Sequence, residues 1–238
     1  ARRLAHEIKN PLTPIRLATE RLEMKLADKL SEKDASLLHR TSRTIITQVD
    51  AMKQMVNDFR DYAKLPVAVL EPMDLNNFFR ELEDFYCTAG TPLSMALEQG
   101  LPKIAGDAGQ LRQVLHNIIS NSIDATAGQE SVEIRLSSTG VRRPDGKVEA
   151  IRVVLEDNGP GFSPNILARA FEPYTTTKPT GTGLGLPMVK KIIEEHHARI
   201  TLGNRTDLEG DVLGAQIVIV FPCLEPKIED PSSVVQNS

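Results

Sequence analysis

The stretch Asp157-Asn158-Gly159-Pro160-Gly161-Phe162 follows directly on the apolar run Ile151-Arg152-Val153-Val154-Leu155. The run predicts a buried strand, and the glycines and proline predict a sharp turn at its end. A buried carboxylate at Asp157 could accept a hydrogen bond from an exocyclic amine such as that of adenine. Gly159 and Gly161 let the backbone approach such a ligand closely. An ordinary turn at a strand end also uses Asp, Asn and Gly, so that alternative stays open.

A second glycine-rich stretch, Gly181-Thr182-Gly183-Leu184-Gly185-Leu186, leads into a helical pattern over residues 186–196. Backbone amides at a helix start, together with the positive end of the helix dipole, attract an anion such as a phosphate. The residues between Phe171 and Thr182, from Glu172 to Gly181, have little periodicity and many hydroxyls, which is typical of a mobile flap over a ligand. Lys178 in this flap is a candidate for binding phosphate oxygens. A glycine-rich helix start is weak evidence when taken alone.

Asp107 and Gln110 predict the N-cap and a box-like partner of a helix over residues 107–125. One stripe of this helix is apolar and is expected to face the core: Leu111, Val114, Leu115, Ile118, Ile119 and Ser122. The other stripe carries Asn117, Asn121 and Asp124 at spacings of four and three. Amide and carboxylate oxygens there could meet a magnesium ion that bridges phosphates, with Asn121 and Asn117 as metal ligands. An ordinary solvated helix face is the alternative.

The stretch Ala5-His6-Glu7-Ile8-Lys9-Asn10-Pro11-Leu12 places a histidine beside a carboxylate in a helical pattern. An imidazole nitrogen that attacks a phosphoryl group must lose a ring proton, and Glu7 could accept it as general base. Asn10 lies four residues after His6, on the same helical face, where an amide could orient a water. A lone His-Glu pair is more often a solvated surface pair, so the chemistry depends on the downstream elements.

Apolar residues continue at helical spacing to Leu26, and a second run extends from Leu38 to Tyr62 at alternating steps of three and four. Pro11 and Pro14 are predicted to lie inside the first helix and to bend it; a start-of-helix proline is the alternative. Two such helices cannot enclose a core alone, which predicts a homodimer with a four-helix bundle.

The sequence divides into a helical first part and a mixed second part. We expect a helical domain at 1–65, a linker at 66–73, an α/β sandwich domain at 74–223 and a disordered tail at 224–238. Helices are predicted at 75–86, after the Ser163-Pro164 cap and at 186–196. Strands are predicted at 132–136, 151–155, 200–202 and 216–220.

Composition excludes several other classes of protein. The chain has 238 residues, 40% of them hydrophobic, and a net charge of −4 with both signs interspersed. This charge argues against direct nucleic-acid binding. Two isolated cysteines, Cys87 and Cys223, do not form a disulfide framework or a metal knuckle. There is no signal peptide and no membrane-length apolar run. The abrupt start in helical pattern indicates a fragment of a longer protein.

These motifs together resemble the sensor histidine kinases of two-component systems. His6 to Leu12 resembles their H box, Asn117 to Ala125 the N box, Asp157 to Phe162 the G1 box, Phe171 to Lys178 the F box and Gly181 to Leu186 the G2 box. The order and spacing match from Arg3 to about Pro222. The stretch from His6 to Ile15 is most similar to the nitrogen-regulation branch of the family.

The resemblance implies a helical-hairpin domain followed by a Bergerat-fold domain that binds ATP and Mg²⁺. It implies autophosphorylation of His6 and transfer to an aspartate of a response regulator receiver domain, with phosphatase activity toward that regulator also expected. It adds Phe171, Thr177, Thr182 and Leu184 to the glycines Gly181, Gly183 and Gly185 as ligand-binding residues. Relatives are membrane-anchored, so the chain is expected to be the cytoplasmic portion of an inner-membrane bacterial sensor.

The sequence departs from the wider superfamily at two places. Related ATPases that hydrolyse their nucleotide carry a water-activating glutamate where this chain has Asn117, which favours the kinases. Many relatives have His-Gly-Gly where this chain has His196-His197-Ala198, which puts the turn there in doubt. Two rival hypotheses remain: a non-catalytic module that binds nucleotide only to regulate a partner, and a protein that acts mainly as a phosphatase.

Overall fold

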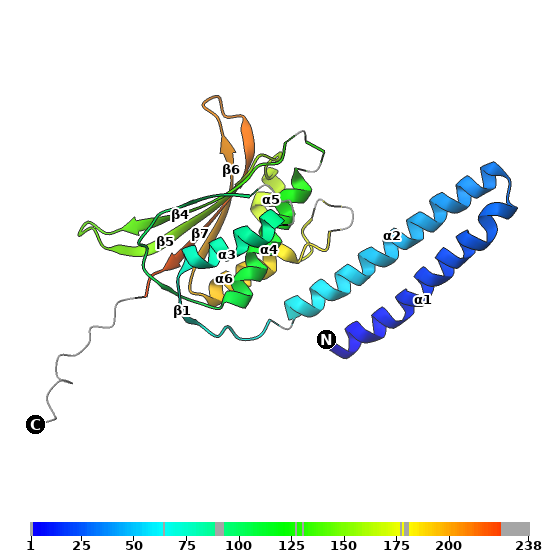
Figure 1. Ribbon diagram of the computed structural model, residues 1–238, viewed down its shortest axis with the longest axis horizontal. Coiled ribbons are helices and arrows are strands. Elements are labelled where there is room, and N and C mark those ends of the chain that lie inside the picture. Colours follow the sequence, from blue (N-terminus) through cyan, green and yellow to red (C-terminus); the bar gives the residue numbers. More distant parts are fainter. Residues whose placement is uncertain are drawn as a thin grey trace, which may run out of the picture. The chain divides into compact units, whose positions relative to one another are not determined.

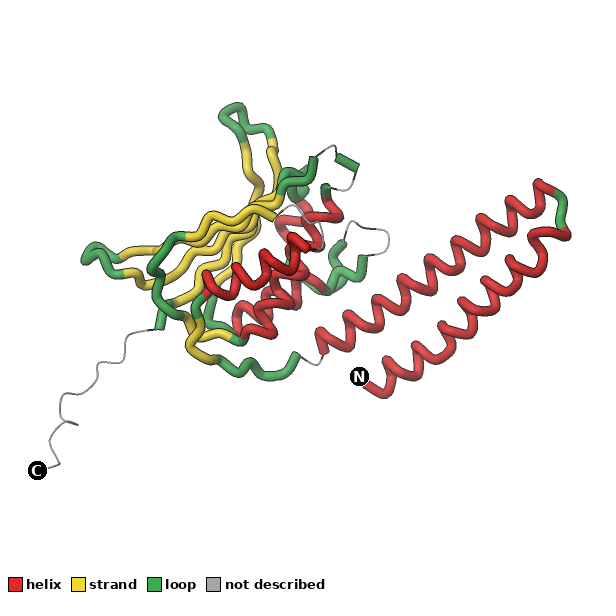
Figure 2. The backbone as a smooth tube through the Cα atoms, viewed as in Figure 1, coloured by secondary structure: helices red, strands yellow, loops and turns green. Residues whose placement is uncertain are grey.

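The computed structural model describes residues 2–63, 65–88, 93–126, 128–129, 131–176, 178 and 181–224, without the side chains of residues 2–10. The predicted tail therefore lies outside the described residues, except Leu224. The chain forms two compact parts, one made of Ala1–Val67 with Ser163–Lys191 and the other of Ala68–Phe162 with Ile192–Ser238. Figure 2 shows that the first part begins with helices and that the sheet belongs to the second.

The first part begins with a helical hairpin. Helix α1 (Arg2–Leu26) and helix α2 (Glu32–Ala63) run antiparallel and are joined by a short 3₁₀ turn, η1 (Ala27–Lys29) (Figure 1). Helix α1 continues through Pro11 and Pro14, which confirms that both prolines lie inside the helix. The Ser31 hydroxyl accepts a hydrogen bond from the Asp34 backbone N–H at 3.2 Å, a capping contact that explains where α2 begins.

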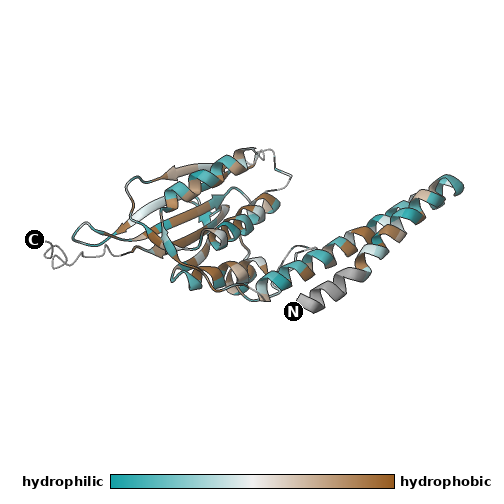
Figure 3. Cartoon of the chain, turned by 60° about the horizontal axis from the view of Figure 1, so that its bottom comes forward, coloured by the Kyte–Doolittle hydropathy of each residue, from teal (hydrophilic) through white to brown (hydrophobic). Residues whose placement is uncertain are grey.

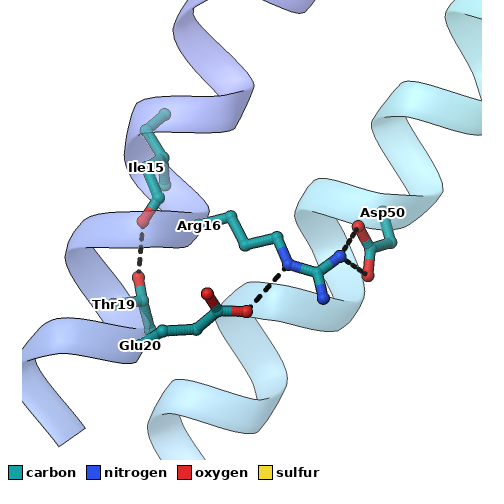
Figure 4. Close-up of polar contacts among 5 residues, drawn as sticks. All are labelled: Ile15, Arg16, Thr19, Glu20 and Asp50. Carbon is teal, nitrogen blue, oxygen red and sulfur yellow. Dashed lines mark hydrogen bonds and ion pairs between the residues drawn. The ribbon is translucent and has the colours of Figure 1, made fainter. Parts of the chain in front are cut away.

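A small set of side chains closes the hairpin. Between the helices the structure buries Leu12, Thr19, Ser42 and Val49. Arg16 of α1 donates from Nη1 to the Asp50 carboxylate of α2 at 2.9 and 3.1 Å, and from Nε to Glu20 Oε1 at 2.9 Å (Figure 4). Because all three side chains are 39–46% exposed to solvent, this network orients the helices more than it stabilises them.

The hairpin leaves much of its apolar surface uncovered. Figure 3 shows hydrophobic residues, in brown, at intervals along both helices. Side chains at least 38% exposed include Ile15, Leu22, Ile45, Met52, Met55 and Phe59, most of them on the stripe that predicts a bundle partner. A soluble helix exposes such a stripe when another helix covers it in the assembly.

The remainder of the first part contains two further helices. Helix α5 (Pro164–Arg169) begins after Ser163, whose hydroxyl accepts the Ile166 backbone N–H at 3.4 Å, as the Ser-Pro pair predicted. Helix α6 (Gly185–Glu195) begins in this part, and its last turn belongs to the second part. Both helices were predicted from the sequence.

The second part is a five-stranded sheet with helices on one face (Figure 1). The strand order is β2-β4-β5-β7-β6. These strands are β2 (Leu93–Leu97), β4 (Ile134–Arg142), β5 (Val148–Asp157), β7 (Val212–Pro222) and β6 (Arg199–Thr206). Strands β2 and β4 are parallel, and every other neighbouring pair is antiparallel. The predicted α/β sandwich is confirmed.

Helices α3 (Leu75–Thr88) and α4 (Ala108–Ala125) cover the sheet. Their apolar stripes meet β5 and β7 in one core that includes Phe78, Phe79, Val114, Val153 and Ile219. Every residue predicted to face the core from α4 is buried. Burial of side chains of this size contributes about 1.5–3 kcal/mol each, which makes this core the main stabilising element of the second part.

Several features of the second part differ from the sequence predictions. Glu71–Met73, placed in the linker, forms strand β1, which pairs antiparallel with β3 (Ile104–Gly106). Strand β2 was not predicted, and β4 begins at Ile134, not at Val132. Asp107 caps α4 as predicted, but the return bond expected from Gln110 is absent because the Asp107 backbone N–H donates to His196 Nε2 at 2.9 Å. Short strands with distant partners carry too little local pattern to be recognised.

Candidate functional site

Asp157 is the last residue of β5 and is buried, with 5% of its surface exposed. Its Oδ1 atom accepts hydrogen bonds from the backbone N–H groups of Gly159 and Ala215, both at 3.0 Å. Among the described residues no hydrogen bond reaches Oδ2. The carboxylate is therefore held in place through one oxygen, and the other oxygen can accept a hydrogen bond from a ligand.

The turn after Asp157 lies against the end of helix α4. A Cβ on Gly159 would lie 3.4 Å from Ala125 Cβ and 3.5 Å from Thr126 Cγ2. Gly161 has φ +72°, a conformation that favours glycine. Asn158 fixes the turn from the other side, because it accepts from the Glu133 N–H at 2.9 Å and donates to the Ser131 carbonyl at 2.9 Å. The structure thus brings the predicted turn and the predicted polar helix together.

The polar face of α4 carries the predicted amides and carboxylate. Asn117 and Asn121 are half-buried, and Asp124 is exposed. Asn117 donates from Nδ2 to the Gln113 carbonyl at 3.0 Å, which leaves its amide oxygen as the acceptor atom. The described part of the chain holds no group of three or more His, Cys, Asp or Glu side chains arranged for a metal ion. Amide oxygens suit a magnesium ion that is otherwise bound by phosphates and water, so the residues fit this ion.

At the start of α4, the carboxyl group of Asp107 has a lowered pKa. Burial raises the pKa of its carboxyl, but hydrogen bonds from the backbone N–H groups of Gln110, Val69 and Gly109 outweigh burial and hold the pKa below its usual value. The ionised cap therefore stabilises the first turn of the helix that carries the polar face.

The flap and the second glycine stretch lie in the first part of the chain. Gly183 has φ +66°, and a Cβ there would lie 2.5 Å from the Tyr174 carbonyl carbon. The Tyr174 backbone N–H donates to the Gly183 carbonyl at 3.0 Å, so the two ends of the flap are joined at its base. Phe171 packs under Lys190, whose Nζ lies 5.2 Å from the ring centroid.

Other flap residues are placed less fully. Lys178 is half-buried, Leu184 is buried and Gly185 begins α6. Thr177 lies outside the described residues. A Cβ on Gly181 would lie 2.5 Å from Thr176 Oγ1, so this position is also tightly packed.

Thr182, just before α6, makes two hydrogen bonds through its side-chain hydroxyl. Its hydroxyl donates to Asp58 Oδ2 of α2 at 2.6 Å. The same hydroxyl accepts the Leu184 backbone N–H at 3.4 Å. A group at the glycine-rich helix start therefore already donates to an anionic oxygen, the kind of atom that a phosphate also presents.

His6, Glu7 and Asn10 all lie within helix α1. The spacing of four residues places Asn10 one turn after His6 on the same helical face. Their side chains are outside the described set, so their roles rest on position and sequence.

Sequence reasoning missed four residues that hold the turn. Asn204 and Arg205 of β6, and Gly214 and Ala215 of β7, contact Asp157, Gly161 or Phe162. They lie more than 40 residues beyond the turn, and nothing in the sequence links them to it. Asn and Gly are uncommon in strands, but their presence in β6 and β7 does not say which turn they contact.

The architecture is a helical hairpin joined to an α/β sandwich. Residues 106–225 match the family of histidine kinase-, DNA gyrase B- and HSP90-like ATPases, and residues 1–66 match the His Kinase A (phospho-acceptor) domain. The chain belongs to the sensor histidine kinases, the family that combines these domains. The predicted family is confirmed.

Similar proteins agree with this membership. A sensor histidine kinase from Rickettsia prowazekii described as NtrY-like is 33% identical over 90% of this chain. The sensory histidine kinase/phosphatase NtrB of Rhodobacter capsulatus is 33% identical over 85% of it. This chain covers 34% of the first relative and 57% of the second. The structure of full-length ShkA in complex with AMPPNP superposes with a TM-score of 0.62 and 25% identity, covering 94% of this chain and 46% of that one.

Among the residues that the structure describes, no helix has the length and apolar character needed to cross a bilayer.

Proposed function

We propose that the chain is an ATP-dependent histidine kinase that phosphorylates His6 and passes the phosphoryl group to an aspartate of a response regulator. The observation that carries the proposal is Asp157, a buried carboxylate held through Oδ1 in a chain that also has a His Kinase A domain. A rigid acceptor for an exocyclic amine is what selective binding of adenine requires.

In this proposal the adenine amine donates to Asp157 Oδ2, and the backbone at Gly159 and Gly161 lies close to the base. The phosphates face Asn117, Asn121 and Asp124. The flap closes over the phosphates, and its proposed ligand-binding residues are Phe171, Thr177, Lys178, Gly181, Thr182, Gly183, Leu184 and Gly185. Backbone amides at the start of α6 and the Thr182 hydroxyl supply donors for anionic oxygens. Asn121 and Asn117 would hold Mg²⁺, which supplies positive charge against the phosphates.

The chemical step uses two neighbouring residues of α1. Glu7 accepts a proton from one ring nitrogen of His6, and the other ring nitrogen attacks the γ-phosphorus of ATP. A nitrogen–phosphorus bond forms, the bond from the γ-phosphorus to the bridging oxygen breaks, and ADP leaves. Lys178 stabilises the negative charge that develops on the transferred group. Asn117 supplies no carboxylate that could activate water, which keeps ATP for the histidine.

The proposed assembly is a homodimer through the hairpin. The exposed apolar side chains of α1 and α2 form a stripe for a second copy, and a His Kinase A match over residues 1–66 supports the same arrangement. The proposed partner in signalling is a response regulator receiver domain.

The proposal also covers the signal, the phosphatase activity and the cellular location. The relative named nitrogen regulation protein NtrY, from Azorhizobium caulinodans, favours a nitrogen-related signal. The relative named sensory histidine kinase/phosphatase NtrB supports dephosphorylation of the regulator, with Asn10 orienting the water. We propose that the chain is the cytoplasmic portion of an inner-membrane-anchored bacterial sensor, as its resemblance to the nitrogen-regulation branch of the family implies.

The test is covalent labelling with γ-labelled ATP in the presence of magnesium. Label should appear on the wild-type chain and should fall at least tenfold in Asp157→Asn or when magnesium is chelated. Asp145→Asn, which changes an exposed loop carboxylate, is the matched control and should label normally. ATP binding without any label would favour the regulatory module. Label that depends neither on Asp157 nor on magnesium would contradict the proposed site.

A further inference from the structure

Asn204 of β6 holds the backbone of Phe162 from both sides. Its Oδ1 accepts the Phe162 N–H at 2.7 Å, and its Nδ2 donates to the Phe162 carbonyl at 2.9 Å. One side-chain amide thus satisfies both main-chain groups of a residue that belongs to no strand. This pair of hydrogen bonds fixes the position and the direction of the backbone at Phe162.

The Asn204 side chain also packs closely against Gly161. A Cβ added to Gly161 would lie 2.8 Å from Asn204 Oδ1 and 2.6 Å from Val212 Cγ1. With φ +72° at Gly161, the turn cannot shift away from Asn204 without changing its conformation.

The beginning of the turn is held by the cross-strand neighbours of Asn204. In the pairing of β6 with β7, Asn204 faces Ala215 and Arg205 faces Gly214. Ala215 donates to Asp157 Oδ1 at 3.0 Å, and Arg205 donates from Nη1 to the Asp157 carbonyl at 3.2 Å. A Cβ on Gly214 would lie 1.8 Å from that carbonyl oxygen. Asn204, Arg205, Gly214 and Ala215, which we call the frame, therefore contact the turn at both of its ends.

We propose that Asn204 is a positioning residue for nucleotide binding, acting through Phe162 and Gly161 and not by touching the ligand. The inference rests on the proposed function, because it concerns the same turn. A turn fixed in advance loses less conformational freedom when the ligand binds, so the frame acts mainly on affinity. Once nucleotide is bound, the distant chemical step is the same with or without Asn204.

The test compares Asn204→Ala, Asn204→Ser and the control Thr201→Ala, an exposed change on the same strand. Calorimetric titration with magnesium ATP should give a Kd raised about tenfold in Asn204→Ala, the size expected for two lost hydrogen bonds. The serine hydroxyl lies one bond short of the Oδ1 position and can accept the Phe162 N–H after a small shift of the turn, so its increase should be about threefold. Thr201→Ala should match the wild type.

Labelling at saturating ATP separates positioning from general damage. The maximal rate should stay within about twofold of the wild type in both Asn204 variants, while KM for ATP rises with Kd. A general loss of structure would lower the maximal rate as well, and that result would overturn the positioning role. If Asn204→Ala fails to fold, Asn204→Ser carries the test.

Two outcomes distinguish this inference from the proposed function. If the wild-type chain binds magnesium ATP and the Asn204 variants bind it with the same Kd, only the positioning role is overturned. If the wild-type chain does not bind magnesium ATP, both the proposed function and the positioning role are overturned.

Discussion

His196 and Asp107, 89 residues apart, are joined by a hydrogen bond of 2.9 Å from the Asp107 backbone N–H to His196 Nε2. The other ring nitrogen, Nδ1, lies 2.8 Å from the Ile192 carbonyl and must carry the proton. His196 is 1% exposed, so a buried imidazole links the residue after α6 to Asp107, the N-cap of α4. This link fixes the helix that carries the polar face of the candidate site.

Replacing His196 by alanine should lower the free energy of unfolding by about 2–4 kcal/mol, because two hydrogen bonds and a buried ring are lost. Urea denaturation of the purified chain measures this quantity.

The neighbouring His197 provides a matched control. It is exposed and has φ +55°, the left-handed conformation that glycine adopts without strain. His197→Gly should therefore leave stability unchanged or raise it by up to about 1 kcal/mol. Equal losses in both variants would show that the ring of His196 is no more important than the turn.

Asp107 should make stability depend on pH in the acid range. Its pKa is lower in the folded chain than its ordinary value, so the ionised form contributes stability above that ordinary value. This contribution disappears as pH falls through the folded pKa. Asp107→Asn keeps a capping oxygen without the charge, so the stability advantage of the wild type should shrink as pH falls below about 4. An advantage that stays constant from neutral to acid pH would contradict the role assigned to the charge.

Gly214 should tolerate no side chain. Because a Cβ there would meet the Asp157 carbonyl oxygen at 1.8 Å, Gly214→Ala must push β7 away from β5. We expect a loss of about 2–4 kcal/mol in unfolding free energy. Gly203 on β6 has open space around its Cβ position, so Gly203→Ala should change stability by less than about 1 kcal/mol.

The exposed stripe of the hairpin should hold two copies together. Met52→Glu places a charge on the 52%-exposed apolar side chain that the bundle would cover. Sedimentation equilibrium should show a dimer for the wild type and at least a tenfold weaker dimer for Met52→Glu. Thr47→Glu adds the same charge away from the stripe and should leave the dimer intact. A monomeric wild type would contradict the bundle.

Local pattern predicted the elements whose information lies in consecutive residues. The stripes of α4, the Asp107 cap and the turn after Asp157 each depend on residues within one helix or one loop. Asn204 and Gly214 could not be found in this way, because their role exists only once β6 and β7 are paired with β5. His196 was noticed only as a departure in a turn, although its ring is a buried link between two helices.

The most direct test of the central claim locates the phosphoryl group. After incubation with γ-labelled ATP and magnesium, the chain should carry label that is lost in acid and kept in alkali. Tandem mass spectrometry should place it on His6. His6→Gln should abolish it, whereas His39→Gln, which removes an exposed histidine of α2, should retain it. Label on another residue, or label that persists in His6→Gln, would contradict a histidine kinase that acts through His6.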